Sequence, residues 1–123
     1  MPPITVLVAD DEPMLRQALA DLLDDQAGVR VVAVAANALQ AVALARAHRP
    51  DVALLDVRMP GGGPAAARGV RTVSPSTHIL AHSAFDDPGS RTAMLTAGAE
   101  DCILKGTEAS TIAARVVSCG RQA

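Results

Sequence analysis

Five short apolar runs recur along this chain, and segments with helical periodicity separate them. Each run is almost continuously apolar, as is typical of strands that are buried on both faces of a sheet. The runs span Ile4–Ala9, Val29–Ala35, Val52–Leu55, His78–Ala81 and Cys102–Leu104. Because parallel strands are joined through a long crossover segment, this alternation predicts a parallel sheet with helices on both of its faces.

The first intervening segment carries clear helix signals. Apolar residues recur at the spacing of one helix face from Leu15 to Leu23. Pro13 stands where a first helical turn would begin, and Gly28 follows the end of the pattern. Asp11 is the expected N-cap of this helix.

The other segments predict four more helices of ordinary length. They are expected at about 38–48, 65–73, 88–98 and 108–121. Asn37 is placed to cap the second helix, with Gln40 as the reciprocal partner. The third helix follows a flexible entry at Gly61–Gly63. Together these elements predict one domain over residues 1–123, a doubly wound α/β sandwich of three layers.

Composition limits what such a domain can bind. Eleven basic residues against thirteen acidic ones give a net charge of −2, so this segment lacks the positive charge that a nucleic acid requires. Its one aromatic residue, Phe85, excludes a module that stacks bases. The core must be built from Val, Leu, Ile and Ala, and alanine occurs 25 times.

The sequence also indicates where the protein is located. No apolar stretch is long enough to span a bilayer, and the acidic N-terminus does not resemble a signal peptide. We therefore expect a cytoplasmic protein that does not bind membranes. Cys102 and Cys119 indicate neither a disulfide framework nor a metal cluster, and both are expected as reduced thiols.

Polar residues follow four of the five predicted strands. Asp10 and Asp11 follow the first, Asp56 the third, Ser83 the fourth and Lys105 the fifth. In doubly wound sheets, ligands bind at the carboxyl ends of the strands. The first and third strands should be neighbours about 4.8 Å apart, so their carboxylates can share one ion. Three carboxylates, a hydroxyl and an ammonium group are thus expected at one edge.

This combination of groups supports phosphoryl transfer. Crowded carboxylates repel one another, and a hard divalent cation such as Mg²⁺ relieves that repulsion. A carboxylate can also be the nucleophile that accepts a phosphoryl group, and the transfer requires stabilisation of charge on the phosphoryl oxygens. Lys105, the Ser83 hydroxyl and backbone N–H groups can supply that stabilisation.

Each of these residues has an ordinary explanation when it is taken alone. Asp11 suits a helix cap, Asp56 a turn after a strand, and Lys105 a solvated surface. Those explanations give no reason why all of them follow strands, so a joint function is favoured. His78 and His82 share one face of the fourth run, but no Cys or third His accompanies them, and we expect packing or surface residues rather than metal ligands.

The motifs ADDEP, LLDVRMPG and ILK, with a fourth strand that ends in Ser-Ala, resemble the response-regulator receiver domain, a CheY-like family. Ser83 and Lys105 lie 22 positions apart, which matches the usual interval in that family. The resemblance covers essentially the whole chain and implies a flavodoxin-like fold with strand order 2-1-3-4-5. The chain looks most like NarL/LuxR-type receivers, which usually precede a helix-turn-helix effector domain; such a domain would lie outside this chain.

The resemblance implies a role for each acidic residue. By analogy, Asp56 is the phosphoacceptor. Asp10 and Asp11 look like the acidic pair that holds Mg²⁺, together with Asp56 and the backbone carbonyl of Arg58. The Arg58 side chain is placed either to shield the phosphoryl group from water or to pair with an acidic neighbour.

The resemblance also implies a set of switch residues. Ser83 is similar to the hydroxyl that moves to meet the phosphoryl group, the Ala84 N–H to a further donor, and Lys105 to the ion-pairing lysine. Cys102 stands three positions before this lysine, where the family usually carries an aromatic ring that changes rotamer. Phe85 lies close enough in sequence to Ser83 to sense the phosphoryl group.

The expected function is signal reception in a two-component system. A sensor histidine kinase would donate the phosphoryl group, and self-association through the fourth helix, fifth strand and fifth helix would follow. The chain would be a regulatory domain rather than an enzyme. Two alternatives remain open. Cys102 favours an interaction module that has lost the switch, whereas an aspartate-nucleophile phosphatase would require a second Asp two positions after Asp56, where Arg58 stands.

Overall fold

The computed structural model describes residues 2–84 and 86–122, and strands alternate with helices throughout this part of the chain. The strands are β1 (Ile4–Ala9), β2 (Val29–Ala35), β3 (Val52–Asp56), β4 (His78–Ser83) and β5 (Asp101–Leu104). The helices are α1 (Pro13–Asp24), α2 (Ala38–His48), α3 (Gly63–Val73), α4 (Pro88–Ala97) and α5 (Ala109–Gly120). Each run predicted as a strand is one, and β3 and β4 extend further toward their carboxyl ends than predicted.

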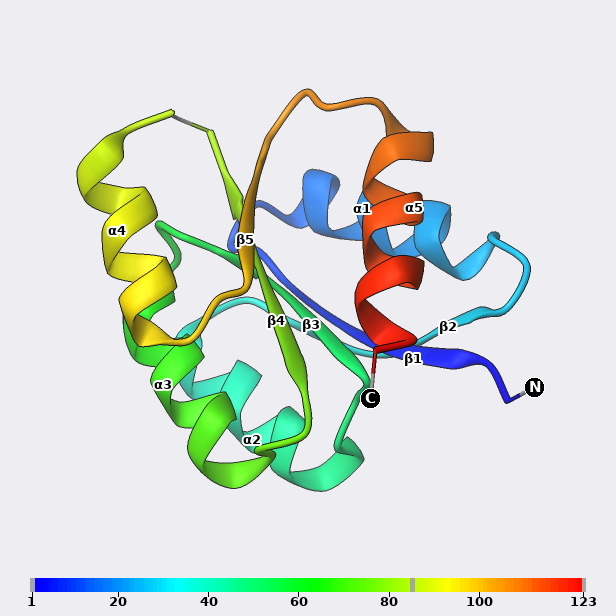
Figure 1. The fold of residues 1–123 in the computed structure, drawn as a ribbon, viewed down its shortest axis with the longest axis horizontal. Coiled ribbons are helices and arrows are strands. Elements are labelled where there is room, and N and C mark those ends of the chain that lie inside the picture. Colours follow the sequence, from blue (N-terminus) through cyan, green and yellow to red (C-terminus); the bar gives the residue numbers. More distant parts are fainter. Residues whose placement is uncertain (1, 85, 123) are drawn as a thin grey trace.

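The strands form one parallel sheet in the order β2-β1-β3-β4-β5. Helices α1 and α5 cover one face of this sheet, and α2, α3 and α4 cover the other (Figure 1). The predicted three-layer, doubly wound fold and its strand order are therefore confirmed. No helix in the described residues is long and apolar enough to cross a membrane.

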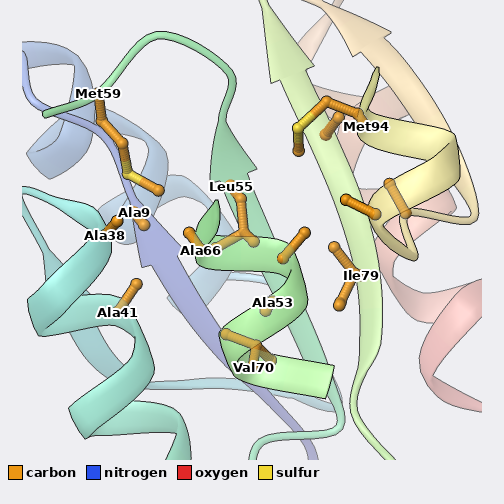
Figure 2. Close-up of a cluster of buried hydrophobic side chains, with 14 of the residues drawn as sticks. Ala9, Ala38, Ala41, Ala53, Leu55, Met59, Ala66, Val70, Ile79 and Met94 are labelled. Atoms are coloured by element: carbon orange, nitrogen blue, oxygen red, sulfur yellow. The ribbon is translucent and has the colours of Figure 1, made fainter. Parts of the chain in front are cut away.

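The core is divided by the sheet into two apolar layers, and β3 contributes to both of them. All five residues of β3 are buried, with Leu54 in the layer beneath α1 and α5 and Leu55 in the layer beneath α2, α3 and α4. In the second layer, alanines line the junction of helices and sheet, among them Ala41 and Ala66 (Figure 2). These small side chains let the helices approach the strands closely, and neither layer contains an aromatic ring among its described residues.

The start of α3 and the cap of α1 differ from prediction. Helix α3 begins at Gly63, two residues before the predicted start, because the Gly63 N–H donates to the Val57 carbonyl at 2.9 Å. A Cβ at Gly63 would lie 2.6 Å from the Val57 Cα, so only glycine permits this close approach. Asp11 does not cap α1: the N-cap position belongs to Glu12, which makes no side-chain cap bond. The Glu12 N–H donates instead to Asp10 Oδ1 at 2.9 Å.

The predicted cap of α2 is present in modified form. Asn37 Oδ1 accepts a hydrogen bond from the Gln40 N–H at 2.8 Å, as expected. Gln40 Oε1 accepts from the Ala36 N–H rather than from that of Asn37, so the reciprocal bond reaches one residue further back. Helix α4 is capped by Asp87, whose Oδ1 accepts from the Gly89 N–H at 3.1 Å.

The packing of α3 on α2 predicts that alanine substitutions at Gly69 and Gly89 change the free energy of unfolding by different amounts. In Gly69→Ala, the new Cβ would lie 2.4 Å from Val42 Cγ2. Val has little rotamer freedom in a helix, so we expect overpacking to lower the free energy of unfolding by about 1–3 kcal/mol in chemical denaturation. The control is Gly89→Ala, whose Cβ meets only Asp87 Oδ1, at 3.5 Å. It should leave the stability unchanged or raise it by up to about 1 kcal/mol; equal losses in both variants would contradict this account.

Candidate functional site

The pairing of β1 with β3 brings two carboxylates together at one edge of the sheet. Ala9 lies opposite Leu55 in this pairing, so Asp10 and Asp56 leave their strands side by side. Both are buried, with exposed fractions of 1% and 3%. Asp11 is exposed at the rim, and one carboxylate oxygen from each of the three residues lies within 4.8 Å of the others.

Lys105 supplies positive charge to this pair. Its Nζ lies 3.1 Å from Asp10 Oδ2 and 3.2 Å from Asp56 Oδ1. Burial lowers the pKa of Lys105, but the hydrogen bonds and charges of the two carboxylates outweigh burial and raise it overall, so the ammonium form is favoured. Gly106 follows with a φ of 94°, a left-handed conformation that turns the chain sharply after the lysine.

The single ammonium group of Lys105 does not neutralise the negative charge of the carboxylates in this pocket. Burial first, and then the charge of Asp10, raise the pKa of Asp56, although the Arg58 N–H at 3.3 Å and Lys105 oppose the rise. Asp10 Oδ2 is buried, and the Lys105 Nζ at 3.1 Å is its charged neighbour. The carboxylates of Asp10, Asp11 and Asp56 outnumber this one ammonium group, and a hard divalent cation with oxygen ligands would neutralise the excess negative charge, so the donor set fits Mg²⁺.

Ser83 and Ala84 reach the same edge from β4. Ser83 is 6% exposed and lies opposite Leu104, the residue before Lys105. The Lys105 N–H donates to the Ser83 carbonyl at 2.7 Å, which ties the ends of β4 and β5 together. Ala84 follows β4 and is exposed. The expectation for Phe85 falls outside the described residues.

Two further residues flank the pocket. The Arg58 guanidinium lies 3.8 Å from Asp87 Oδ2, so the acidic neighbour foreseen for it is the cap residue of α4. Cys102 lies opposite Ala81 in β5 and is half-buried. Cys102 and Ser83 both line a cavity of about 20 Å³, which a larger side chain at position 102 would fill. That volume is about enough for one water molecule.

Two residues beside the site were not predicted to lie there: Arg16 was not singled out in the sequence, and His82 was predicted only as a packing or surface residue. The Arg16 guanidinium donates to the Asp10 carbonyl at 2.9 Å and anchors α1 to the end of β1. His82 is 2% exposed, and neither ring nitrogen has a partner among the described residues. Burial, and then the charge of Lys105, lower the pKa of His82 to about 4, although Asp10 opposes this. Its position opposite Asp56 in the β3–β4 register is the signal that could have identified it.

Comparison with known proteins identifies the family of this chain. The profile of the family described as response regulator receiver domain matches residues 6–117. The chain belongs to this family. A solved structure of the signal receiver domain of NarL from Mycobacterium tuberculosis superimposes with a TM-score of 0.94 at 35% identity, with both chains covered completely.

Curated relatives of this receiver have names that describe regulatory proteins. The transcriptional regulatory protein NarL of Mycobacterium tuberculosis is 37% identical over 119 residues, which are 96% of this chain and 55% of the relative. The oxygen regulatory protein NreC of Staphylococcus epidermidis is 36% identical over 94% of this chain and 55% of its own length. The receiver thus spans about half the length of the curated relatives it matches.

The environment of His82 predicts a pH-dependent stability. Its pKa falls from an ordinary 6.5 to about 4 on folding, so the unfolded chain binds the proton more readily between these values. Stability contributed by the neutral ring is therefore present above pH 6.5 and is lost as the pH falls toward 4. We expect His82→Leu to raise the free energy of unfolding by about 1–3 kcal/mol, because two unpartnered nitrogens are removed, and to flatten this part of the pH profile.

Denaturation of the metal-free receiver at a series of pH values measures both effects. His48→Leu, at the exposed end of α2, is the matched control and should keep the wild-type decrease. An unchanged pH profile in His82→Leu would show that other groups cause the decrease.

Proposed function

We propose that this receiver accepts a phosphoryl group from a sensor histidine kinase on Asp56, in a Mg²⁺-dependent reaction, and controls an output through the resulting conformational change. The observation that carries the proposal is the buried pair of Asp10 and Asp56 with Lys105 between them. The names of NarL and NreC support transcription as the output. The regulated output would require an effector domain, in keeping with the half-length coverage of both relatives.

The chemistry is a transfer between two residues. An Asp56 oxygen attacks phosphorus, the P–O bond forms as the P–N bond to the kinase histidine breaks, and the leaving imidazole takes a proton. Lys105 turns from Asp56 to a phosphoryl oxygen, and the Ser83 hydroxyl and Ala84 N–H donate to the others. Asp10, Asp11, Asp56 and the Arg58 carbonyl would hold Mg²⁺, which supplies positive charge to the transferred group.

We infer that the output face comprises α4, β5 and α5. Ion pairs join these elements, because Asp101 of β5 contacts Arg91 of α4 and Arg115 of α5. Leu95 and Leu104 expose about two fifths of their surface on the same elements, which supports self-association there. The cavity beside Ser83 is lined by both Cys102 and Arg91, so a movement of Ser83 is sterically connected with this face.

Cys102 supports a second candidate function. In a receiver that signals through an aromatic ring, the ring would occupy the position of this thiol, and a thiol is too small to act in the same way. The chain could then be an interaction module that keeps the fold without the switch. The complete acidic set and Lys105 favour the first function.

Phosphorylation by a small donor tests the leading proposal. After incubation with acetyl phosphate and Mg²⁺, intact mass spectrometry should show one phosphoryl group per chain. The adduct should disappear in Asp56→Asn and with a chelator in place of Mg²⁺, and it should persist in Asp25→Asn, a change at an exposed carboxylate after α1. An adduct that survives in Asp56→Asn would refute the assignment, and sustained turnover of a generic phosphate ester would indicate a phosphatase.

A phosphoryl mimic separates the switch from the interaction module. With beryllofluoride and Mg²⁺, amide NMR signals should shift near Asp56 and also across α4, β5 and α5, and sedimentation should show an increase in mass. Asp56→Asn is the control, which should show neither change. Shifts confined to the acidic pocket would support the interaction module instead.

A further inference from the structure

A second group of potential ligands lies at the opposite end of the sheet from the acidic pocket. His78 begins β4, Glu100 precedes β5, and Cys119 lies in the last turn of α5. His78 Nδ1, a Glu100 carboxylate oxygen and Cys119 Sγ all lie within 4.8 Å of one another. Since His78 and Ser83 are the two ends of one strand, about 16 Å of β4 separates this cluster from the phosphoryl site.

We propose that His78, Glu100 and Cys119 form a binding site for a transition-metal ion, with Zn²⁺ as its ion. The proposal is independent of phosphorylation at Asp56. The donor set is one imidazole, one carboxylate and one thiol, which is the mixed N, O and S chemistry that Zn²⁺ accepts and that Mg²⁺ and Ca²⁺ do not. Three protein ligands leave a fourth tetrahedral position for water.

The existing contacts already hold two of the ligands together. His78 Nδ1 and Glu100 Oε2 are 2.5 Å apart and form a hydrogen bond. A bound cation would take the place of this hydrogen bond, and the two atoms would separate to the spacing of tetrahedral ligands, about 3.3–3.8 Å. Because all three separations are at most 4.8 Å, the other two need to shorten by no more than about 1.5 Å to reach that spacing.

The orientation of the imidazole is also set. His78 Nε2 lies 3.2 Å from the Gln122 carbonyl, to which it can donate a hydrogen bond. In the neutral ring this bond leaves the lone pair on Nδ1, the atom that faces Glu100. A hydrogen bond from the second nitrogen to a carbonyl is the usual support of a metal-bound histidine.

The contact between His78 and Glu100 could be an ordinary ion pair, but such a pair gives no reason for the buried Cys119 thiol beside it. Cys119 is 7% exposed, and burial first, followed by the charge and hydrogen bond of Glu100, raises the pKa of its thiol to about 11. Arg115 opposes this rise, but it also pairs with Asp101. Metal binding would release the thiol proton, so the bound ion would meet a thiolate at Cys119.

Two surface hollows give access to the cluster. One, of about 210 Å³, is lined by Glu100, Cys119 and Gln122, with Arg115 and Asp101 on its wall. The other, of about 460 Å³, is lined by His78, Glu100 and Gln122, with charged neighbours on its far side, Asp51 and Arg71. The ligands therefore lie between solvent-filled spaces that can admit an ion and a bound water.

Cobalt substitution tests the site directly. Co²⁺ is added to the Asp56→Asn chain in excess Mg²⁺, and near-ultraviolet absorption is followed, because a thiolate bound to Co²⁺ gives a charge-transfer band that the acidic pocket cannot produce. We expect one equivalent to bind and Zn²⁺ to displace it. The band should be absent in Cys119→Ser and unchanged in the matched control Cys102→Ser. In His78→Gln, the affinity for Co²⁺ should be at least 10-fold lower than in the parent chain.

Thermal unfolding gives a second measure. Zn²⁺ should raise the Tm of the wild-type chain and of Cys102→Ser, and it should not raise that of Cys119→Ser. Far-ultraviolet circular dichroism establishes that each variant is folded; if Cys119→Ser is not, His78→Gln and Glu100→Gln decide the question. No charge-transfer band in the wild-type chain, or a band that depends on Cys102 rather than Cys119, would overturn the proposal.

Discussion

The parallel pairing of β1 with β3 is the constraint on which the site depends. It places two carboxylates side by side in a buried position, where burial and the charge of Asp10 disfavour the ionised form of Asp56. A slip of one residue would turn Asp56 to the other face of the sheet, away from Asp10 and Lys105. Lys105, which reaches the pair from β5 at the edge of the sheet, therefore makes the electrostatics of the site conditional on the whole sheet being assembled.

Most of the fold follows from sequence because it depends on local patterns. Apolar runs and helical spacing identify the strands and helices, and the rule that parallel strands end at one edge brings Asp10, Asp56, Ser83 and Lys105 together. The start of α3 could not be predicted, since it depends on contact between Gly63 and the Val57 backbone, which only the tertiary fold creates. Asp11 was assigned to a cap that the local geometry of Glu12 does not use.

The sequence predicted a packing or surface role for His82 without deciding between the two, and it did not predict the second ligand cluster, for a related reason. His82 is inaccessible only because α1 and α5 cover that face of β4. His78, Glu100 and Cys119 come from a strand, a loop and a helix, at spacings that no periodic pattern records. The sequence predicted a packing or surface role for His78 and a reduced thiol at Cys119, and only the fold brings these two residues together with Glu100.

The aliphatic character of the core has a practical consequence. With no Trp or Tyr in the chain, the protein has almost no intrinsic fluorescence and very little absorbance at the wavelength used for concentration. Emission from any Trp-containing protein mixed with it would belong to that protein alone, so complexes could be followed without a background. One Trp placed on a chosen helix would likewise be a unique optical probe of the region around it.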